Sequence, residues 1–338
     1  MRFGPVPLDQ ALGGILAYAV TVEGARLPKG KMLGADDQAA LAAAGVRHVT
    51  VALLDAGDVD ENSAAERLAA ALVPDAAAQG VEVTRPHAGR VNLNAVGPGV
   101  VGMDVAALQA LNRVDPGITL ATLPPFCRVQ KGTLVGTVKI ISYAVAGAAL
   151  AQACAVARRA LWVRPVVMRA AGLVLTSVPG QDPKLNAKAV RVTGARLAAL
   201  GMELAEVVEV PHDEGAIAAA LAGLSGDMAL ILTGSATSDL YDVAPQAVRR
   251  AGGHVQRFGM PVDPGNLLFL GELAGRPVLG LPGCARSPAL NGADWVLERL
   301  ACGLAVTDDD IAAMGVGGLL KEIPSRPMMR EGRLEGRP

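Results

Sequence analysis

Hydrophobic and polar positions follow two different patterns along this chain, and the change falls after Arg164-Pro165. Beyond that point short apolar runs, which predict strands, alternate with longer segments that fit helices. The strand candidates are GLVLTSV from Gly172, ELAEVVEV from Glu203, MALILT from Met228, HVQRFGM from His254 and PVLGL from Pro277, with helices expected over 185–200 and 213–224. This alternation predicts an α/β fold with a mostly parallel sheet and helices on both faces. In such sheets a ligand lies beyond the carboxyl ends of the strands.

The first half of the chain predicts a β-rich α+β region. Extended apolar residues run over 13–22, a helix capped by Asp36 ends near Gly45, and a strand follows over 48–54. A second helix is expected to begin near Asn62 or Ser63, with Glu66 as a capping-box partner. Between Val81 and Val145 the Gly, Pro, Val and Thr content favours short strands. We therefore expect an N-terminal region over 1–165, an α/β domain over 166–305, and a C-terminal extension over 306–338 whose last residues are disordered.

Composition narrows the class of protein. Of the 338 residues 51% are hydrophobic but only 3% are aromatic, so the core is expected to consist of small aliphatic side chains. A net charge of -1 gives no field for nucleic acid, and the four cysteines form no CxxC pair, which argues against zinc and redox motifs. The apolar stretch 140–157 is too rich in alanine and polar residues to predict a membrane span, and no secretion signal is visible. We expect a cytoplasmic protein that contacts neither nucleic acid nor membrane.

The first candidate loop follows the strand that ends at Thr233. Gly234 and small polar residues lead from there to a helix that is expected to begin near Asp242. Small residues let backbone N–H groups approach an anion, and the helix N-terminus adds a favourable dipole. The residues expected to bind the ligand are Thr233, Gly234, Ser235, Ala236, Thr237 and Ser238. Spacing alone equally fits an ordinary strand-to-helix loop.

The second candidate loop follows the next predicted strand and has the same character. Its ligand-binding candidates are Gly280, Leu281, Pro282, Gly283, Arg286 and Ser287, with Ser287 expected to cap a helix and Pro288 in its first turn. Two such loops at one edge of a sheet could enclose one ligand, and Arg286 could pair with a phosphate. Without further information Arg286 also fits a solvated surface position.

These loops together resemble the molybdopterin-binding domain shared by molybdenum insertases and molybdopterin adenylyltransferases. The residues that carry the resemblance occur in the family's order and are Thr233-Gly234-Ser235, Asp239, Tyr241-Asp242, Gly252-Gly253, Pro264-Gly265 and Gly280 to Gly283. The similarity continues upstream to about Ala171, and the N-terminal half resembles stand-alone molybdopterin-binding proteins through residues 13–45. The resemblance implies a binder of molybdopterin that acts in molybdenum-cofactor biosynthesis or delivery, with Asp239 and Asp242 contacting the pterin ring or Mg²⁺. If the protein is catalytic, these two are the catalytic residues that hold the ion, whereas Asp242 equally fits a plain helix N-cap.

The sequence also departs from the family. Insertases have lysines on both sides of the Pro-Gly turn, where this chain has Asp263 and Asn266, and their Gly-Asp-Glu loop is replaced by residues 177–182. Loss of these cations favours binding of the pterin phosphate over insertion of molybdenum. Cys284, at a position where insertases usually have asparagine, is expected to be a small buried residue, although a thiol there could also meet the metal or the dithiolene.

Several functions remain open at this stage. The resemblance implies a molybdenum transferase or an adenylyltransferase if the protein is catalytic, and it implies a homo-oligomer with a molybdoenzyme or another cofactor-biosynthesis protein as partner. One alternative is an enzyme that acts on a different nucleotide. Another is an interaction module that has kept the fold and lost the ligand, which Asp263 and Asn266 make credible.

Overall fold

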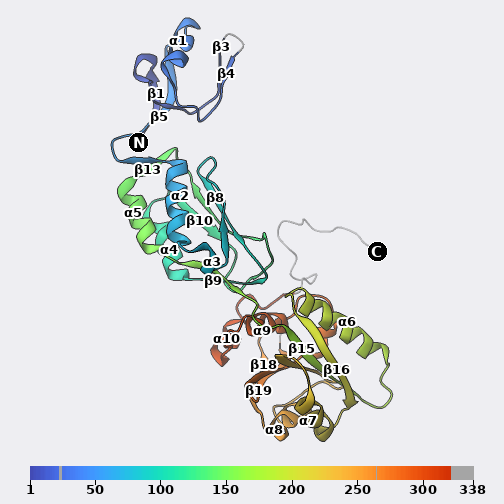
Figure 1. Cartoon of the computed structure of the whole chain (residues 1–338). Helices are drawn as coiled ribbons and strands as arrows, with labels where there is room; N and C mark the ends of the chain where they lie inside the picture. Colours follow the sequence, from blue (N-terminus) through green and yellow to red (C-terminus); the bar gives the residue numbers. More distant parts are fainter. Residues whose placement is uncertain (23–24, 264, 321–338) are drawn as a thin grey trace. The chain divides into compact units, whose positions relative to one another are not determined.

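The computed structural model describes residues 1–22, 25–263 and 265–320 (Figure 1). Contacts divide the chain into one unit of Met1–Gly97 with Val101–Arg164 and a second unit of Pro98–Val100 with the chain from Pro165 onward. In the described part of the chain, every helix is too short or too polar to cross a membrane. The expected disorder of the last residues falls on 321–338, which lie outside the described residues, and the domain limits stay predictions.

The second unit contains a six-stranded sheet whose order is β16-β15-β17-β20-β19-β18. Strands β16, β15, β17 and β20 are parallel, whereas β19 and β18 are antiparallel additions at one side. Their bounds are β15 Ala170–Ser177, β16 Glu203–Pro211, β17 Met228–Leu232, β18 His254–Met260, β19 Asn266–Leu273 and β20 Arg276–Gly280. The five predicted strands are confirmed, and β19 is a sixth strand of this sheet that was not predicted.

Alternate residues of each central strand pack against different helices, which explains why these strands are apolar throughout. Leu173 and Leu175 of β15 join one core cluster with α6 and α9, whereas Val174 between them joins a second cluster with α7 and α8. Because neighbouring side chains point to opposite faces, both faces of the sheet must be covered by helices. The helix bounds are α6 Lys184–Ala198, α7 Glu214–Gly223, α8 Val243–Arg250, α9 Gly292–Ala301 and α10 Asp308–Ala313. The predicted α/β fold with helices on both faces is confirmed.

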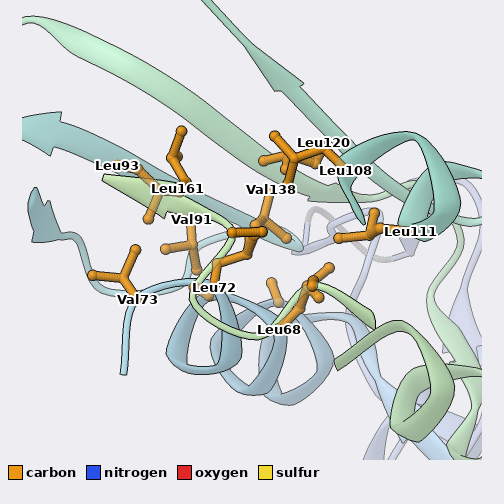
Figure 2. Packing of buried hydrophobic residues seen from close by; sticks show 14 of the residues in the cluster. Leu68, Leu72, Val73, Val91, Leu93, Leu108, Leu111, Leu120, Val138 and Leu161 are labelled. Atoms are coloured by element: carbon orange, nitrogen blue, oxygen red, sulfur yellow. The ribbon is translucent and has the colours of Figure 1, made fainter. Parts of the chain in front are cut away.

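The first unit is mixed α and β, and its larger core is built by a helix lying on a sheet. Leu68 and Leu72 of α2 point toward Val91 and Val138 on the strands, and all four side chains are fully buried (Figure 2). The sheet order is β10-β12-β8-β7. A smaller cluster around Leu16, Leu41 and Val51 forms the core of the first fifty residues.

The remaining strands and helices have the following bounds. The strands are β1 Arg2–Pro7, β2 Ile15–Leu16, β3 Val20–Val22, β4 Ala25–Leu27, β5 His48–Leu53, β6 Asp58–Asp60, β7 Val81–Val83, β8 Arg90–Ala95, β9 Gly99–Met103, β10 Ile118–Thr122, β11 Arg128–Val129, β12 Leu134–Ile140, β13 Ala144–Ala146 and β14 Leu161–Pro165. The helices are α1 Ala35–Ala43, α2 Glu61–Leu72, α3 Ala76–Gln79, α4 Val105–Val114 and α5 Gly147–Val156.

Several local predictions in this half were wrong. Gly34 rather than Asp36 precedes α1, and the carboxylate of Asp37 accepts the Gly34 N–H. Asp60, not Ser63, caps α2, and its carboxylate accepts the N–H groups of Asn62 and Ser63. If Ser63 were the cap, these two N–H groups would have no partner in the helix.

The region between Val81 and Val145 also contains a helix that was not expected. Helix α4 begins after Asp104, whose carboxylate accepts the N–H of Ala107, and its Leu108 and Leu111 face the core. The composition of this region did not indicate the ten-residue helix, because the residues on both sides of it form short strands.

Candidate functional site

The two candidate loops lie at the same edge of the sheet, on neighbouring strands. Strands β17 and β20 are paired in parallel, so Thr233 and Leu281 follow their carboxyl ends side by side. Strand β15 runs parallel to β17 on its other side and ends at Ser177. Three loops therefore lie at the carboxyl edge of the sheet. We call them the first loop (178–183), the glycine loop (233–242) and the GLPG loop (280–291).

Gly234 is required by the close approach of the first loop to the glycine loop. A Cβ atom at this position would lie 2.4 Å from Oε1 of Gln181 and 2.8 Å from the carbonyl oxygen of Thr176. The Gly234 N–H donates to Oγ1 of Thr176 across 2.7 Å, and that fully buried hydroxyl is 3.0 Å from Nδ1 of His212. Thr176 and His212 were not among the predicted site residues, since nothing in sequence indicates that a threonine on one strand binds the loop after another.

The hydroxyl groups of the glycine loop are of two kinds. Thr233 and Thr237 are buried, whereas Ser235 and Ser238 are exposed together with Ala236. The Ser238 hydroxyl donates to the carbonyl oxygen of Ala236. Ser235 is thus the exposed hydroxyl nearest to the end of β17.

The two acidic residues of the glycine loop organise its backbone. Asp239 accepts the N–H of Tyr241 through Oδ1. Asp242 caps α8, accepting the N–H of Ser238 through Oδ2 and that of Val243 through Oδ1. Among the described residues, no cluster of three His, Cys, Asp or Glu side chains has the spacing of a metal site. Both carboxylates lie in one loop, and each already accepts at least one backbone hydrogen bond.

The GLPG loop differs from its prediction at the start of the following helix. Residues Gly283–Arg286 form a short 3-10 helix, and α9 begins later with Asn291 as its cap. The prediction that Ser287 caps this helix was wrong, because Asn291 and Asp294 form a reciprocal capping box one turn further on. The Ser287 hydroxyl instead accepts the N–H of Ala289.

Arg286 connects the two candidate loops. Its Nη2 donates to the carbonyl oxygen of Thr233 across 2.7 Å, and its Nε is buried with no hydrogen-bond partner among the described residues. Burial lowers the pKa of the Arg286 guanidinium below its ordinary value, but an arginine keeps its charge. Arg286 is therefore a half-buried cation between the loops rather than a solvated surface residue.

Arg196 of α6 fixes the rest of the GLPG loop, and it was not among the predicted site residues. Its guanidinium donates to the carbonyl oxygens of Ala285 and Ser287, and it forms an ion pair with Asp294. These contacts span about ninety positions, so no local signal could identify them. The backbone of the loop is held by the side chain of a neighbouring helix.

Asp263 and Asn266 have structural partners. Asn266 is 5% exposed, donates to Oδ1 of Asn291 and accepts the N–H of Leu268. Asp263 accepts the N–H of Leu320 through Oδ1 and has a left-handed backbone with φ of 52°. Pro264, the first residue of the predicted Pro-Gly turn, lies outside the described residues. Asn266 is thus a buried part of the α9 cap and does not offer its side chain to a ligand.

The expectation that Cys284 is buried was wrong. The residue is exposed at the start of the GLPG loop, and its Sγ accepts a hydrogen bond from Nδ2 of Asn291 across 3.0 Å. The 3-10 turn places its side chain outward, because Ala285 is the residue of this turn that faces the core.

A cavity of about 400 Å³ lies away from these loops, at the amino-terminal edge of the sheet. It is lined by the start of β18 and β20 and by the end of α9, including His254, Glu272 and Leu304. Its polar side chains are exposed, and Gln256 is already bonded to the carbonyl oxygen of Val306. This edge lacks the convergence of loops that the carboxyl edge has.

A family model matches part of the second unit. Residues 191–301 match the family model described as a probable molybdopterin binding domain, and residues 5–53 match a domain of unknown function. The match to the first of these families confirms the resemblance drawn from the two loops, both of which it contains.

No curated protein matches this chain. Among solved structures, a molybdopterin biosynthesis MoeA protein from Pyrococcus horikosii is similar at 14% identity and a TM-score of 0.31, over 89% of this chain and 75% of that chain. A molybdenum cofactor biosynthesis protein from Pyrococcus furiosus is similar at 14% identity and a TM-score of 0.19, over 82% of this chain and 57% of that chain.

Proposed function

We propose that this chain, whose residues 191–301 form a domain of the molybdopterin-binding family, binds molybdopterin in molybdenum-cofactor biosynthesis or delivery. The observation that carries the proposal is the hydrogen bond from Arg286 to the carbonyl oxygen of Thr233, which joins the glycine loop to the GLPG loop. Two loops that are joined at one edge of a sheet can enclose one small ligand.

The pterin phosphate is assigned to the glycine loop. Exposed backbone at Ser235 and Ala236 precedes α8, and backbone N–H groups at such a turn can bind phosphate oxygens. Arg286 adds the positive charge. Its buried Nε has no hydrogen-bond partner among the described residues, and a ligand oxygen would supply that partner. Gly283 is exposed and would then lie over the pterin side of the ligand, whereas Leu281 and Pro282 are buried beneath the loop.

If the protein is catalytic, we assign it a metal or nucleotide transfer to molybdopterin in which Asp239 and Asp242 hold Mg²⁺. The donor set fits, since Mg²⁺ usually binds one or two carboxylates together with waters and substrate phosphates. Asp242 is the weaker donor because both of its oxygens accept backbone N–H groups. When bound, the ion would neutralise phosphate charge, while these carboxylates keep the loop in its present conformation.

Binding is favoured over molybdenum insertion by the surroundings of Asn266. Insertion of molybdate requires cations that draw a second anion toward the ligand. Asn266 is buried in the α9 cap, so its position offers no cation to that reaction. We therefore propose that the main role is binding or delivery of molybdopterin. Transfer of a metal or nucleotide to molybdopterin is a second proposed role, which needs its own test.

Calorimetry with molybdopterin tests the proposal on three proteins: wild type, Gly234→Val and Arg286→Gln. Valine at 234 would collide with the first loop, so circular dichroism must first show that this variant is folded. Arg286→Gln removes the charge with little change in bulk and serves if Gly234→Val does not fold. We expect both variants to bind at least tenfold more weakly than wild type, and equal binding by all folded proteins would overturn the assignment of the loops.

A thermal-shift screen separates this proposal from its alternatives. Molybdopterin should raise the melting temperature of the wild-type protein, because a ligand that binds the native state stabilises it. Stabilisation by an unrelated nucleotide alone would favour a nucleotide enzyme. A protein that no pterin and no nucleotide stabilises would be an interaction module that has lost the ligand.

A further inference from the structure

Tyr241 stands out in the glycine loop because it is a large aromatic residue left in solvent. Its side chain is 70% exposed, and it directly precedes Asp242, the cap of α8. The loop around it is ordered by hydrogen bonds, since the Tyr241 N–H donates to Asp239 and the Ser238 N–H donates to Asp242. The aromatic ring is therefore presented by a fixed segment of backbone.

Arg249 of α8 holds one face of this ring. Its guanidinium carbon lies 5.2 Å from the centre of the Tyr241 ring. The same guanidinium donates to the carbonyl oxygen of Leu240 and to Oε1 of Gln246. A cation over a ring face is attracted to it, so Arg249 restricts the rotation of the tyrosine side chain.

The opposite face of the ring is open. Arg249 covers one face of the ring, and the tyrosine side chain is still 70% exposed. The accessible surface of the ring is therefore its other face. A flat aromatic surface whose rotamer is already restricted loses little conformational entropy when a planar ring stacks on it. The pair of Tyr241 and Arg249 thus has the properties of a stacking platform.

We infer that Tyr241 binds the planar pterin ring of the ligand by stacking, with Arg249 as the residue that positions it. This inference rests on the proposed function, which places the phosphate of the same ligand on the same loop. It assigns the two ends of the ligand to different residues: Ser235 and Arg286 bind the phosphate, and Tyr241 selects an aromatic heterocycle.

The test uses two probes on the full-length protein: unsubstituted pterin, which has no phosphate, and inorganic phosphate, which has no ring. We expect pterin to acquire circular dichroism in its absorption band when bound to wild type and to Tyr241→Phe. With Tyr241→Leu we expect at least a tenfold loss of pterin affinity, in line with the contribution of stacking in other proteins, and unchanged phosphate affinity. Arg249→Gln should give an intermediate loss with a weaker induced signal.

Tyr18 supplies a matched control, since it is a similarly exposed tyrosine in the other unit, at 65% exposure. Tyr18→Leu should leave pterin binding unchanged. Equal pterin affinity of Tyr241→Leu and wild type would overturn the inference, whereas loss of phosphate binding in Arg286→Gln would still support the proposed function. A wild-type protein that binds molybdopterin but gives no induced signal with pterin would overturn the inference alone, and one that binds neither probe nor molybdopterin would overturn both.

Discussion

Arg286 donates a hydrogen bond to the carbonyl oxygen of Thr233 across 2.7 Å, although the two residues are 53 positions apart in the sequence. The bond joins the loop after β17 to the loop after β20. Because the carbonyl belongs to the last buried residue before Gly234, Arg286 helps to hold the backbone where the proposed phosphate site begins.

We expect Arg286→Lys to weaken molybdopterin binding about tenfold or more, because lysine keeps the charge but lacks the planar group that can bind a carbonyl and a phosphate together. Loss of the bond to Thr233 should also lower the free energy of unfolding by about 1 kcal/mol. Calorimetry and urea unfolding measure the two effects.

Arg276→Lys is the control for this prediction. Arg276 is also a half-buried arginine that donates to backbone carbonyls, those of Leu221 and Leu224, but it lies at the amino-terminal end of β20. Its variant should lose stability and keep its affinity. An Arg286→Lys protein with the affinity of wild type would contradict the role assigned to the guanidinium.

Thr176→Val tests the link between β15 and the glycine loop. Valine has nearly the shape of threonine but cannot accept the Gly234 N–H, so a partly buried donor loses its partner, and the contact with Nδ1 of His212 is lost as well. We expect a loss of about 1–3 kcal/mol in the free energy of unfolding, measured by urea denaturation. Thr176→Ser keeps the acceptor and should recover most of this loss. If Val and Ser variants are equally stable, the hydroxyl does not hold the loop.

The sequence predicted the carboxyl edge because the signals for it are local. A buried strand that runs into Gly234 or into Gly280 to Gly283 can be recognised from adjacent residues, and the parallel arrangement follows from strand and helix alternation. Strand β19 was missed because it pairs antiparallel with both of its neighbours, outside that alternation.

The contacts that shape the site could not be predicted in the same way. Arg196 and Thr176 act on backbone groups that are distant in sequence, and a sequence does not indicate which carbonyl or N–H a side chain will meet. The position of Asn266 invited comparison with a ligand-binding lysine, but tertiary packing turns its side chain into the cap of α9.

Gly280→Ala should destabilise the second unit at the first residue of the GLPG loop. A Cβ atom at Gly280 would lie 2.0 Å from the ring of Phe269, which is 1% exposed and has no room to move. Such overpacking costs about 1–3 kcal/mol.

The double variant Gly280→Ala with Phe269→Leu distinguishes this clash from other effects. The smaller side chain makes room for the added methyl group, so the two changes together should destabilise less than the sum of the single variants. Additive losses in urea unfolding would contradict the clash.

Cys302 gives a prediction for alkaline pH. Burial raises the pKa of its thiol from 9.0 to about 11. Since the folded-state pKa is higher, the unfolded chain releases this proton first, and the stabilisation is complete below pH 9.0 and lost as pH rises through about 11. Urea midpoints for wild type should therefore fall more steeply over this window than those of Cys302→Ala. Parallel slopes for the two proteins would show that the thiol does not contribute.

Asn266→Lys tests whether the missing lysine explains the departure from the insertases. The side chain at 266 is 5% exposed and packs in the cap of α9, where the Asp294 carboxylate is already paired with Arg196, so an ammonium there would be a buried and uncompensated charge. An uncompensated buried charge costs about 3–5 kcal/mol, and we expect that loss in urea unfolding without any gain in molybdopterin affinity. Leu267→Lys is the matched control, because its side chain is 36% exposed on the same strand and a lysine there should reach solvent. A stable Asn266→Lys protein that binds the ligand more tightly would mean that position 266 can face the site, and that this chain differs from the insertases by substitution rather than by the packing of its cap.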